Sequence, residues 1–299
     1  VVRGLVTVDL RAANNELRAM SEAVTTSGGY LVPEQMGSEV IDKARNNSAV
    51  MRAGARTVPM ESDVLTFARI AADASFALKG ENAAFTESAP TIDAITFTAK
   101  TFGCVVRASR ELAEDAPNFG GMITDSLAAA LAVELDRLSL VGSGSATFDG
   151  LQAISGVNAV TAVGTPATYA KWMTGIQNIL NANGKPNAVI LCPRDAVKLG
   201  GLLDTTNQPM QTPPLYRDLL QLVTTSLPVT EGAGANESSS YIGDFTQLWW
   251  GVRDSIRVEV STEEGDSFQN HQVAIKCWFR GAFNCAHANH FTRLSGILA

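Results

Sequence analysis

The feature that most constrains the fold is a pair of strand-like stretches separated by a long polar segment. Apolar residues alternate with polar ones in residues 54–71 and again in residues 94–109. Between them, residues 72–93 follow neither helical nor strand periodicity and carry isolated apolar residues among small and polar ones. This pattern predicts a long β-hairpin that projects from the body of the protein. Because an isolated hairpin cannot bury its apolar residues, we expect it to lie on another surface.

The strongest helical segment covers residues 118–141. It follows Asp115-Ala116-Pro117 and ends before Gly142-Ser143-Gly144, which are typical start and stop signals. Apolar side chains recur at helical steps, which places on one face Ile123, Leu127, Leu131, Leu135 and Leu138. Glu134, Asp136 and Arg137 lie off this stripe, so we expect them to face solvent or a neighbouring subunit.

The second half of the chain, residues 168–292, predicts a unit of α/β character. Residues 168–183 have helical spacing with an inward face, which consists of Trp172, Ile176, Ile179 and Leu180. Residues 187–192 predict a buried strand, a further helix begins at Pro193, and residues 213–225 predict another helix. Further strands are expected at 227–229, 241–245, 248–250, 256–260 and 273–279.

Charge and composition exclude several classes of function. The net charge is −7 and the basic residues form no cluster, whereas tight nucleic-acid binding needs many cationic contacts to phosphates. No apolar run approaches the roughly 18 residues of a membrane-spanning helix. The four cysteines, Cys104, Cys192, Cys277 and Cys285, lack a CxxC motif, which is typical of free buried thiols.

Residues with catalytic or metal-binding chemistry form no recognisable site. The three histidines, His271, His287 and His290, have no nucleophile elbow to pair with. His287 and His290 follow Cys277 and Cys285, but their spacing matches no common zinc module. The glycines after the long helix follow a helix, whereas a phosphate-binding loop follows a strand. We therefore predict no catalytic, cofactor-binding or metal-binding residue and no enzyme.

Seven motifs occur along the chain in a recognisable order. They are GGYLVP (28–33), ALKGENAAFTESAPT (77–91), VVRASRELAEDAPN (105–118), VGSGSATFDGL (141–151), NAVILCPRDAVKLGGLLD (187–204), YIGDF (241–245) and IRVEVSTEEGDSFQNHQVAIKCWFR (256–280). Together they resemble the major capsid protein of tailed double-stranded DNA bacteriophages, which has the Hong Kong 97-type fold. The resemblance covers nearly the whole chain.

The resemblance implies an α+β fold with an N-terminal arm, a long β-hairpin extended loop, a peripheral domain with a long spine helix, and an axial α/β domain. The implied boundaries are 1–33 for the arm, 34–59 for the start of the peripheral domain, 60–100 for the extended loop, 101–145 for the peripheral domain with its spine helix, 146–262 for the axial domain, 263–283 for the peripheral return strand and 284–299 for the C-terminal axial segment.

The resemblance also implies where subunits touch. The contact residues expected on the extended loop are Phe76, Leu78, Lys79, Glu81 and Phe85. The residues expected at the junction of arm and body are Gly28, Gly29 and Pro33. The apolar stripe of the 118–141 helix is expected to pack as the spine.

Two features of covalent processing follow from the same resemblance. A chain that starts at Val1 would fit the proteolytic removal of a preceding scaffolding segment. Some members of the family join subunits through a Lys–Asn bond promoted by a Glu. Here Lys79 falls at the lysine position, His271 occupies the partner position and Trp278 replaces the Glu, so we expect no cross-link.

A protein of this family assembles as hexamers and pentamers into the icosahedral head shell that encloses the phage genome without binding it specifically. It works with a portal protein and, where one exists, a decoration protein. It needs no cofactor or membrane, assembles in the host cytoplasm and resides in the virion. Two alternatives stay open: the shell of an encapsulin-type nanocompartment, which shares the fold, and a soluble α/β enzyme, which would need a substrate pocket.

Overall fold

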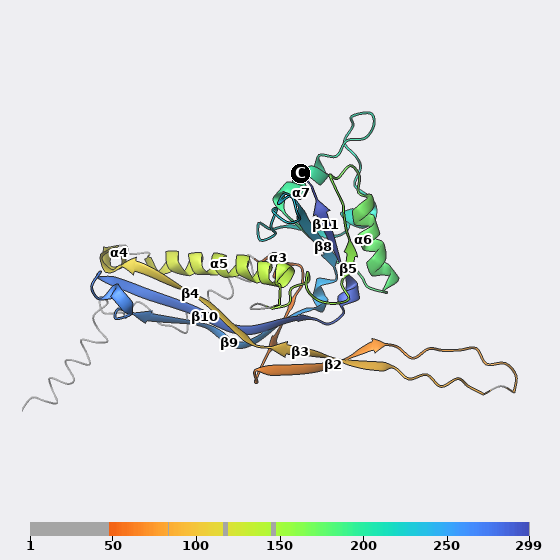
Figure 1. Cartoon of the computed structure of the whole chain (residues 1–299), viewed down its shortest axis with the longest axis horizontal. Coiled ribbons are helices and arrows are strands. Elements are labelled where there is room, and N and C mark those ends of the chain that lie inside the picture. Colours follow the sequence, from red (N-terminus) through yellow and green to blue (C-terminus); the bar gives the residue numbers. More distant parts are fainter. Residues whose placement is uncertain (1–47, 83, 116–118, 145–147, 299) are drawn as a thin grey trace, which may run out of the picture. The chain divides into compact units, whose positions relative to one another are not determined.

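The computed structural model describes residues 48–82, 84–115, 119–144 and 148–298 of the chain (Figure 1). The arm predicted for residues 1–33, with Gly28, Gly29 and Pro33, lies outside the described residues. The described chain forms two compact units. One contains residues 102–129 and 255–279 and the other contains residues 44–101, 130–254 and 280–299, each within its described parts.

Helices and strands are mixed along the described chain without a simple repeat. The helices are α3 (Ala49–Arg52), α4 (Arg110–Asp115), α5 (Phe119–Val141), α6 (Ala170–Asn181), α7 (Pro193–Gly200) and α8 (Pro214–Arg217). Short 3-10 turns are η1 (Phe245–Gln247), η2 (Gly265–Ser267) and η3 (Ala288–His290). The strands are β1 (Arg56–Pro59), β2 (Val64–Ala72), β3 (Thr91–Thr98), β4 (Lys100–Ser109), β5 (Asn158–Val160), β6 (Ala188–Leu191), β7 (Leu220–Val223), β8 (Ser238–Gly243), β9 (Leu248–Ser261), β10 (Gln272–Cys285) and β11 (Phe291–Ile297). The predicted mixed α+β class is confirmed.

The larger unit contains a five-stranded sheet in the order β5-β11-β8-β6-β7. Helix α6 lies along this sheet (Figure 1) and buries Trp172, Ile176 and Ile179 in the main apolar core. Strand β6 is buried along its whole length, as its uninterrupted apolar run predicts. Leu180 is exposed, so its predicted inward orientation is wrong. It follows Ile179 directly, and a helix turns each successive residue about 100° away from its neighbour.

The predicted helix over residues 213–225 is wrong beyond its first turn. Helix α8 ends at Arg217, and Leu220–Val223 instead form β7, which pairs in parallel with β6. A buried strand needs a partner for its backbone groups, and this pairing overrides the helical spacing of the leucines. The strand expected at residues 227–229 is also absent from the described structure.

A second sheet has the strand order β1-β9-β10-β4. The separate strands expected at 248–250 and 256–260 are one continuous strand, β9. Conversely, the single stretch predicted over 94–109 is divided at Ala99 into β3 and β4, which belong to different sheets. Strand β3 pairs only with β2 in a two-stranded sheet, so the change of partner marks the end of the hairpin.

The end of α5 agrees with the predicted stop, and two glycines allow the chain to turn back there. The backbone N–H groups of Leu151 and Gln152 donate to carbonyls of the last turn at 2.8 and 3.0 Å, and that of Gly150 donates to the carbonyl of Gly142, directly after the helix, at 3.0 Å. A Cβ atom at Gly142 would lie 2.4 Å from the Phe148 carbonyl, and one at Gly150 would lie 2.5 Å from the Gly142 nitrogen. Only glycine permits this close approach. No helix in the described part of the chain has the length and apolar character needed to span a bilayer.

Candidate functional site

The long hairpin predicted from the sequence is present in the larger unit. Strands β2 and β3 pair antiparallel from Val64 opposite Thr98 to Ile70 opposite Ile92, and an irregularity follows before the last pair. Beyond the strands, residues 73–90 form a loop without helix or strand in its described positions (Figure 1). This is the polar segment that fitted neither periodicity.

The tip of the hairpin exposes its apolar side chains. Phe76 and Leu78 are as exposed as in an extended peptide, at 103% and 105%, and Phe85 is 75% exposed. Lys79 and Glu81 are exposed beside them, and the Lys79 ammonium lies 4.7 Å from the centre of the Phe85 ring. A single chain therefore offers uncovered apolar surface here, which monomeric proteins rarely keep in large patches.

Few contacts hold the described residues of the loop in place. The backbone N–H of Ser75 donates to the Ser88 hydroxyl at 2.8 Å, and the two hydroxyls lie 3.2 Å apart. These bonds join the two sides of the loop near the strands. The segment between Ser75 and Ser88 carries the exposed apolar residues, and its described residues do not bury them.

The base of the same hairpin is packed on an aromatic cluster. The ring of Phe67 on β2 meets those of Phe97 and Trp249 edge to face, with centroids 5.8 and 5.4 Å apart. Phe97 and Trp249 are stacked at 6.3 Å, and Phe97 is fully buried. Such ring pairs add to the energy gained by burial.

Ionic contacts hold the base at two further points. Arg69 donates to the Asp93 carboxylate across the hairpin, at 2.7 Å for the closer nitrogen, and also to the carbonyl oxygen of Ala286 at 2.8 Å. These contacts lower the pKa of Asp93, chiefly through the hydrogen bond from Arg69, with help from the backbone N–H of Ala94.

The second ionic point lies where β2 begins. Asp63 accepts from Arg253 at 2.6 Å and from Arg280 at 2.9 Å. Exposed ion pairs contribute little to stability one by one. Together with the aromatic cluster, they hold the hairpin strands against the parts of β9 and β10 that belong to this unit.

The apolar stripe of α5 is buried in part. Leu127, Leu135 and Leu138 are buried, whereas Ile123 and Leu131 are half-buried. Their role as a packing spine stays a prediction. Glu134 and Arg137 are exposed to solvent, which is one of the two surroundings expected for them, and they form an ion pair at 2.6 Å.

The expectation that Asp136 faces solvent or a neighbour is wrong, because this carboxylate is buried. It accepts from the Ser48 hydroxyl at 2.6 Å and from the backbone N–H groups of Ala49 and Val50 at 2.9 and 3.0 Å. The Thr224 hydroxyl donates a longer bond of 3.3 Å. Burial raises the pKa of Asp136, and these four donors oppose that effect. The signal that could have found it is its place between Leu135 and Leu138, beside the buried stripe.

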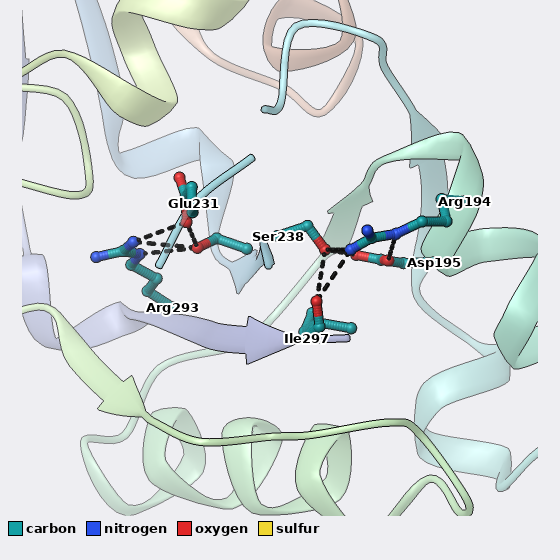
Figure 2. Close-up of polar contacts among 7 residues, drawn as sticks. Arg194, Asp195, Glu231, Ser238, Arg293 and Ile297 are labelled. Carbon is teal, nitrogen blue, oxygen red and sulfur yellow. Dashed lines mark hydrogen bonds and ion pairs between the residues drawn. The ribbon is translucent and has the colours of Figure 1, made fainter. Parts of the chain in front are cut away.

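A polar network ties the last strand of the five-stranded sheet to the start of α7 (Figure 2). Arg194 donates to the Ser238 hydroxyl at 2.8 Å and to the Ile297 carbonyl at 2.9 Å. Asp195 is buried and accepts from both Arg194 and Ser238. Its position in the first turn of α7 also suits the positive end of the helix dipole.

A second network lies beside it and joins β8 and β11 to Glu231, which precedes β8 (Figure 2). Arg293 donates to Glu231 and to the Ser239 hydroxyl, both at 3.1 Å, and Ser239 also donates to Glu231. In each network one arginine is paired with one carboxylate, Arg194 with Asp195 and Arg293 with Glu231. This arrangement secures the sheet and presents no free nucleophile or base toward a substrate. Among the described residues no cluster of His, Cys, Asp and Glu could hold a metal ion.

Comparison with known proteins identifies the class. The family model described as the phage capsid family matches residues 28–296. A major capsid protein of Klebsiella oxytoca phage phiKO2 is 27% identical over 271 residues, which are 84% of this chain and 63% of that protein. The chain thus spans less than two thirds of the length of this curated relative.

Solved structures agree on the fold. A structure from Mycobacterium phage Adephagia has a TM-score of 0.68 at 17% identity, over 84% of this chain and 90% of the other. The capsid of a native GTA particle gives 0.66 at 16% identity, with coverage of 84% and 90%. A structure from Microbacterium phage Oxtober96 gives 0.65 at 17% identity, with coverage of 83% and 90%.

The mixed α+β architecture, with its projecting hairpin and long helix, is therefore a phage capsid fold. The chain belongs to the phage capsid family. This is a family of structural proteins of the virion, so the expectation that the chain is not an enzyme is confirmed.

Proposed function

We propose that this chain is a major capsid protein that assembles with copies of itself, as hexamers and pentamers, into the icosahedral head shell of a tailed phage. Each hairpin lies on a neighbouring subunit in the shell and covers its apolar tip there. The function is mechanical: the shell encloses the double-stranded DNA genome, and no reaction is catalysed.

The observation that carries this proposal is the contrast within the hairpin. Its base is fixed by buried aromatic rings and ionic contacts, while Phe76, Leu78 and Phe85 at its tip are exposed. Ordering a hairpin in this way holds an apolar surface away from its own chain at a defined place, which lowers the entropic cost of binding a partner. In a symmetric shell the same contact repeats in every subunit, so a modest contact energy is multiplied.

The remaining assignments follow from this function. The contact residues on the tip include Lys79 and Glu81, which add charged groups around the apolar ones. A portal protein and, where present, a decoration protein would bind the finished shell. The net charge of −7 supports enclosure of DNA without adhesion, since like charges repel.

Electron microscopy of the purified protein tests the proposal. We expect closed icosahedral particles in which density for the tip of one subunit lies against the next. Particles that enclose a cargo enzyme and no genome when isolated from their natural source would favour the nanocompartment alternative. A protein that stays a monomer under all assembly conditions would contradict a shell function.

A further inference from the structure

Strands β4 and β10 are neighbours in the four-stranded sheet, and their contacts define which residues face each other. The backbone N–H of Arg110, directly after β4, donates to the His271 carbonyl, directly before β10, at 3.0 Å. At the other end, the rings of Phe102 and Phe279 contact each other with centroids 4.9 Å apart. Phe102 lies eight residues before Arg110, and Phe279 lies eight residues after His271. The two contacts therefore give the same antiparallel register.

This register places Cys104 directly opposite Cys277. Each lies six residues from the Arg110–His271 pair and two from the Phe102–Phe279 pair. Hydrogen-bonded and non-hydrogen-bonded pairs alternate along an antiparallel ladder. The pair Cys104–Cys277 is six positions from the hydrogen-bonded pair Arg110–His271, so it is also hydrogen-bonded. Cα atoms in such a pair are about 5.5 Å apart, which is within the range that a disulfide bridges.

The surroundings of the two thiols support this placement. A Cβ atom at Gly103 would lie 2.4 Å from the Cys277 carbonyl oxygen and 2.9 Å from Trp278, so the two backbones approach closely at this point. Cys104 is exposed and Cys277 is half-buried, so the expectation of buried thiols is wrong for these two, and both are free thiols. Burial raises the pKa of Cys277 to about 11, and the nearby Cys104 thiol contributes to that increase. Cys104 is therefore the sulfur that a dissolved oxidant meets first.

We propose that Cys104 and Cys277 are a redox-active pair that closes to a cross-strand disulfide between β4 and β10. With a small dissolved disulfide such as oxidised glutathione, the Cys104 thiolate attacks one sulfur and releases one glutathione thiol. The Cys277 thiol then loses its proton to water and attacks the Cys104 sulfur, which expels the second glutathione. Two protein thiols are oxidised, and one small disulfide is reduced to two thiols.

The test is peptide mapping of the purified protein after incubation with oxidised glutathione. The protein is denatured, its remaining thiols are alkylated, and it is digested without reductant. We expect a peptide pair joined through Cys104 and Cys277, an intact mass lower by about 2 Da before alkylation, and reversal by dithiothreitol. The oxidised protein should unfold at a temperature higher by about 5 °C, because the bond constrains the unfolded chain.

Two variants control for register and for the other thiols. A Cys104→Ser, Val105→Cys variant keeps the number of thiols but moves the exposed one to the opposite face of β4, so it should form no internal bond. A Cys192→Ser, Cys285→Ser variant removes the two buried thiols and should close as the wild type does. The proposal is overturned if the wild-type map shows both cysteines alkylated, a lasting glutathione adduct on Cys104, or a bond between two copies of the chain. It is equally overturned if the Val105→Cys variant closes to Cys277.

Discussion

The base and the tip of the hairpin belong to the same short segment, yet their apolar side chains have opposite surroundings. Phe97 at the base is buried against Phe67 and Trp249, whereas Phe85 at the tip has three quarters of its surface exposed. The base is therefore part of the folding core of its own chain, and the tip is the exposed apolar surface that we propose a neighbouring subunit covers. Under the proposed function, the base of this β-hairpin serves stability and its tip serves assembly, and this division can be tested residue by residue.

The largest effect on stability is expected for Phe97→Ala. Removing a buried aromatic ring leaves a cavity and should lower the free energy of unfolding by about 3–5 kcal/mol. Denaturant unfolding of the unassembled chain measures this, and Phe85→Ala is the matched control because the same atoms are removed at the tip. We expect Phe85→Ala to stay within about 0.5 kcal/mol of the wild type. Equal losses for the two variants would remove the distinction between base and tip.

The second largest effect is expected for Asp136→Asn. This variant tests whether the loss of unfolding free energy also depends on burial when the side chain is polar. The amide keeps the shape but replaces an acceptor by an NH₂ group that faces the donors of Ser48, Ala49 and Val50. The loss should be about 2 kcal/mol in the same unfolding measurement. Glu134→Gln, in the exposed pair with Arg137, should cost less than about 1 kcal/mol. Equal losses of unfolding free energy for the two variants would mean that burial of the Asp136 carboxylate gives it no special role in stability.

A smaller effect is expected from acid at the base. The pKa of Asp93 is lower in the folded chain than its ordinary value of 3.8, so the carboxylate form favours the folded state. Its contribution is present above about pH 4 and is lost as the pH falls through the lowered folded pKa. Between pH 6 and pH 3 the unfolding temperature of the wild type should therefore fall further than that of Asp93→Asn. Parallel pH profiles for the two proteins would contradict this.

The smallest effect on stability, with the largest on assembly, is expected for Phe85→Asp. The tip has no apolar layer of its own to disrupt, so the unfolding free energy should change by no more than about 0.5 kcal/mol. If a neighbouring subunit covers the tip, as we propose, a charge placed there should nevertheless abolish particles, since an unpaired charge is costly to bury. Particle yield by sedimentation and electron microscopy measures this. If Phe85→Asp forms as many particles as the wild type, the tip is not needed for assembly.

The sequence predicted the elements whose signals are local. The alternation of β2 and β3, the stripe of α5 and the apolar run of β6 each identify their own secondary structure. Strand β7 was missed because its identity depends on pairing with β6, about 30 residues earlier in the chain. The break at Ala99 was missed for a related reason, since β3 and β4 have similar residues and differ only in the strands they pair with.

The candidate site follows the same rule. The exposed residues of the tip could be named from their isolation in a polar segment, but the base could not. Its ionic contacts join Asp63 to Arg253 and Arg280, and Arg69 to Ala286, across roughly 190 to 220 residues of sequence. No spacing rule relates such distant positions.

The carboxylate of Asp136 has a consequence for the order of events in folding. Its donors Ser48, Ala49, Val50 and Thr224 lie 86 to 88 residues away, on both sides in the chain. Contacts of such long range must first overcome the entropy of closing two large loops, so they form late. Losing the carboxylate should then accelerate unfolding far more than it slows refolding, which stopped-flow measurements on Asp136→Asn can resolve. In kinetic terms, the contacts of this one side chain form after the folding transition state and mainly slow unfolding.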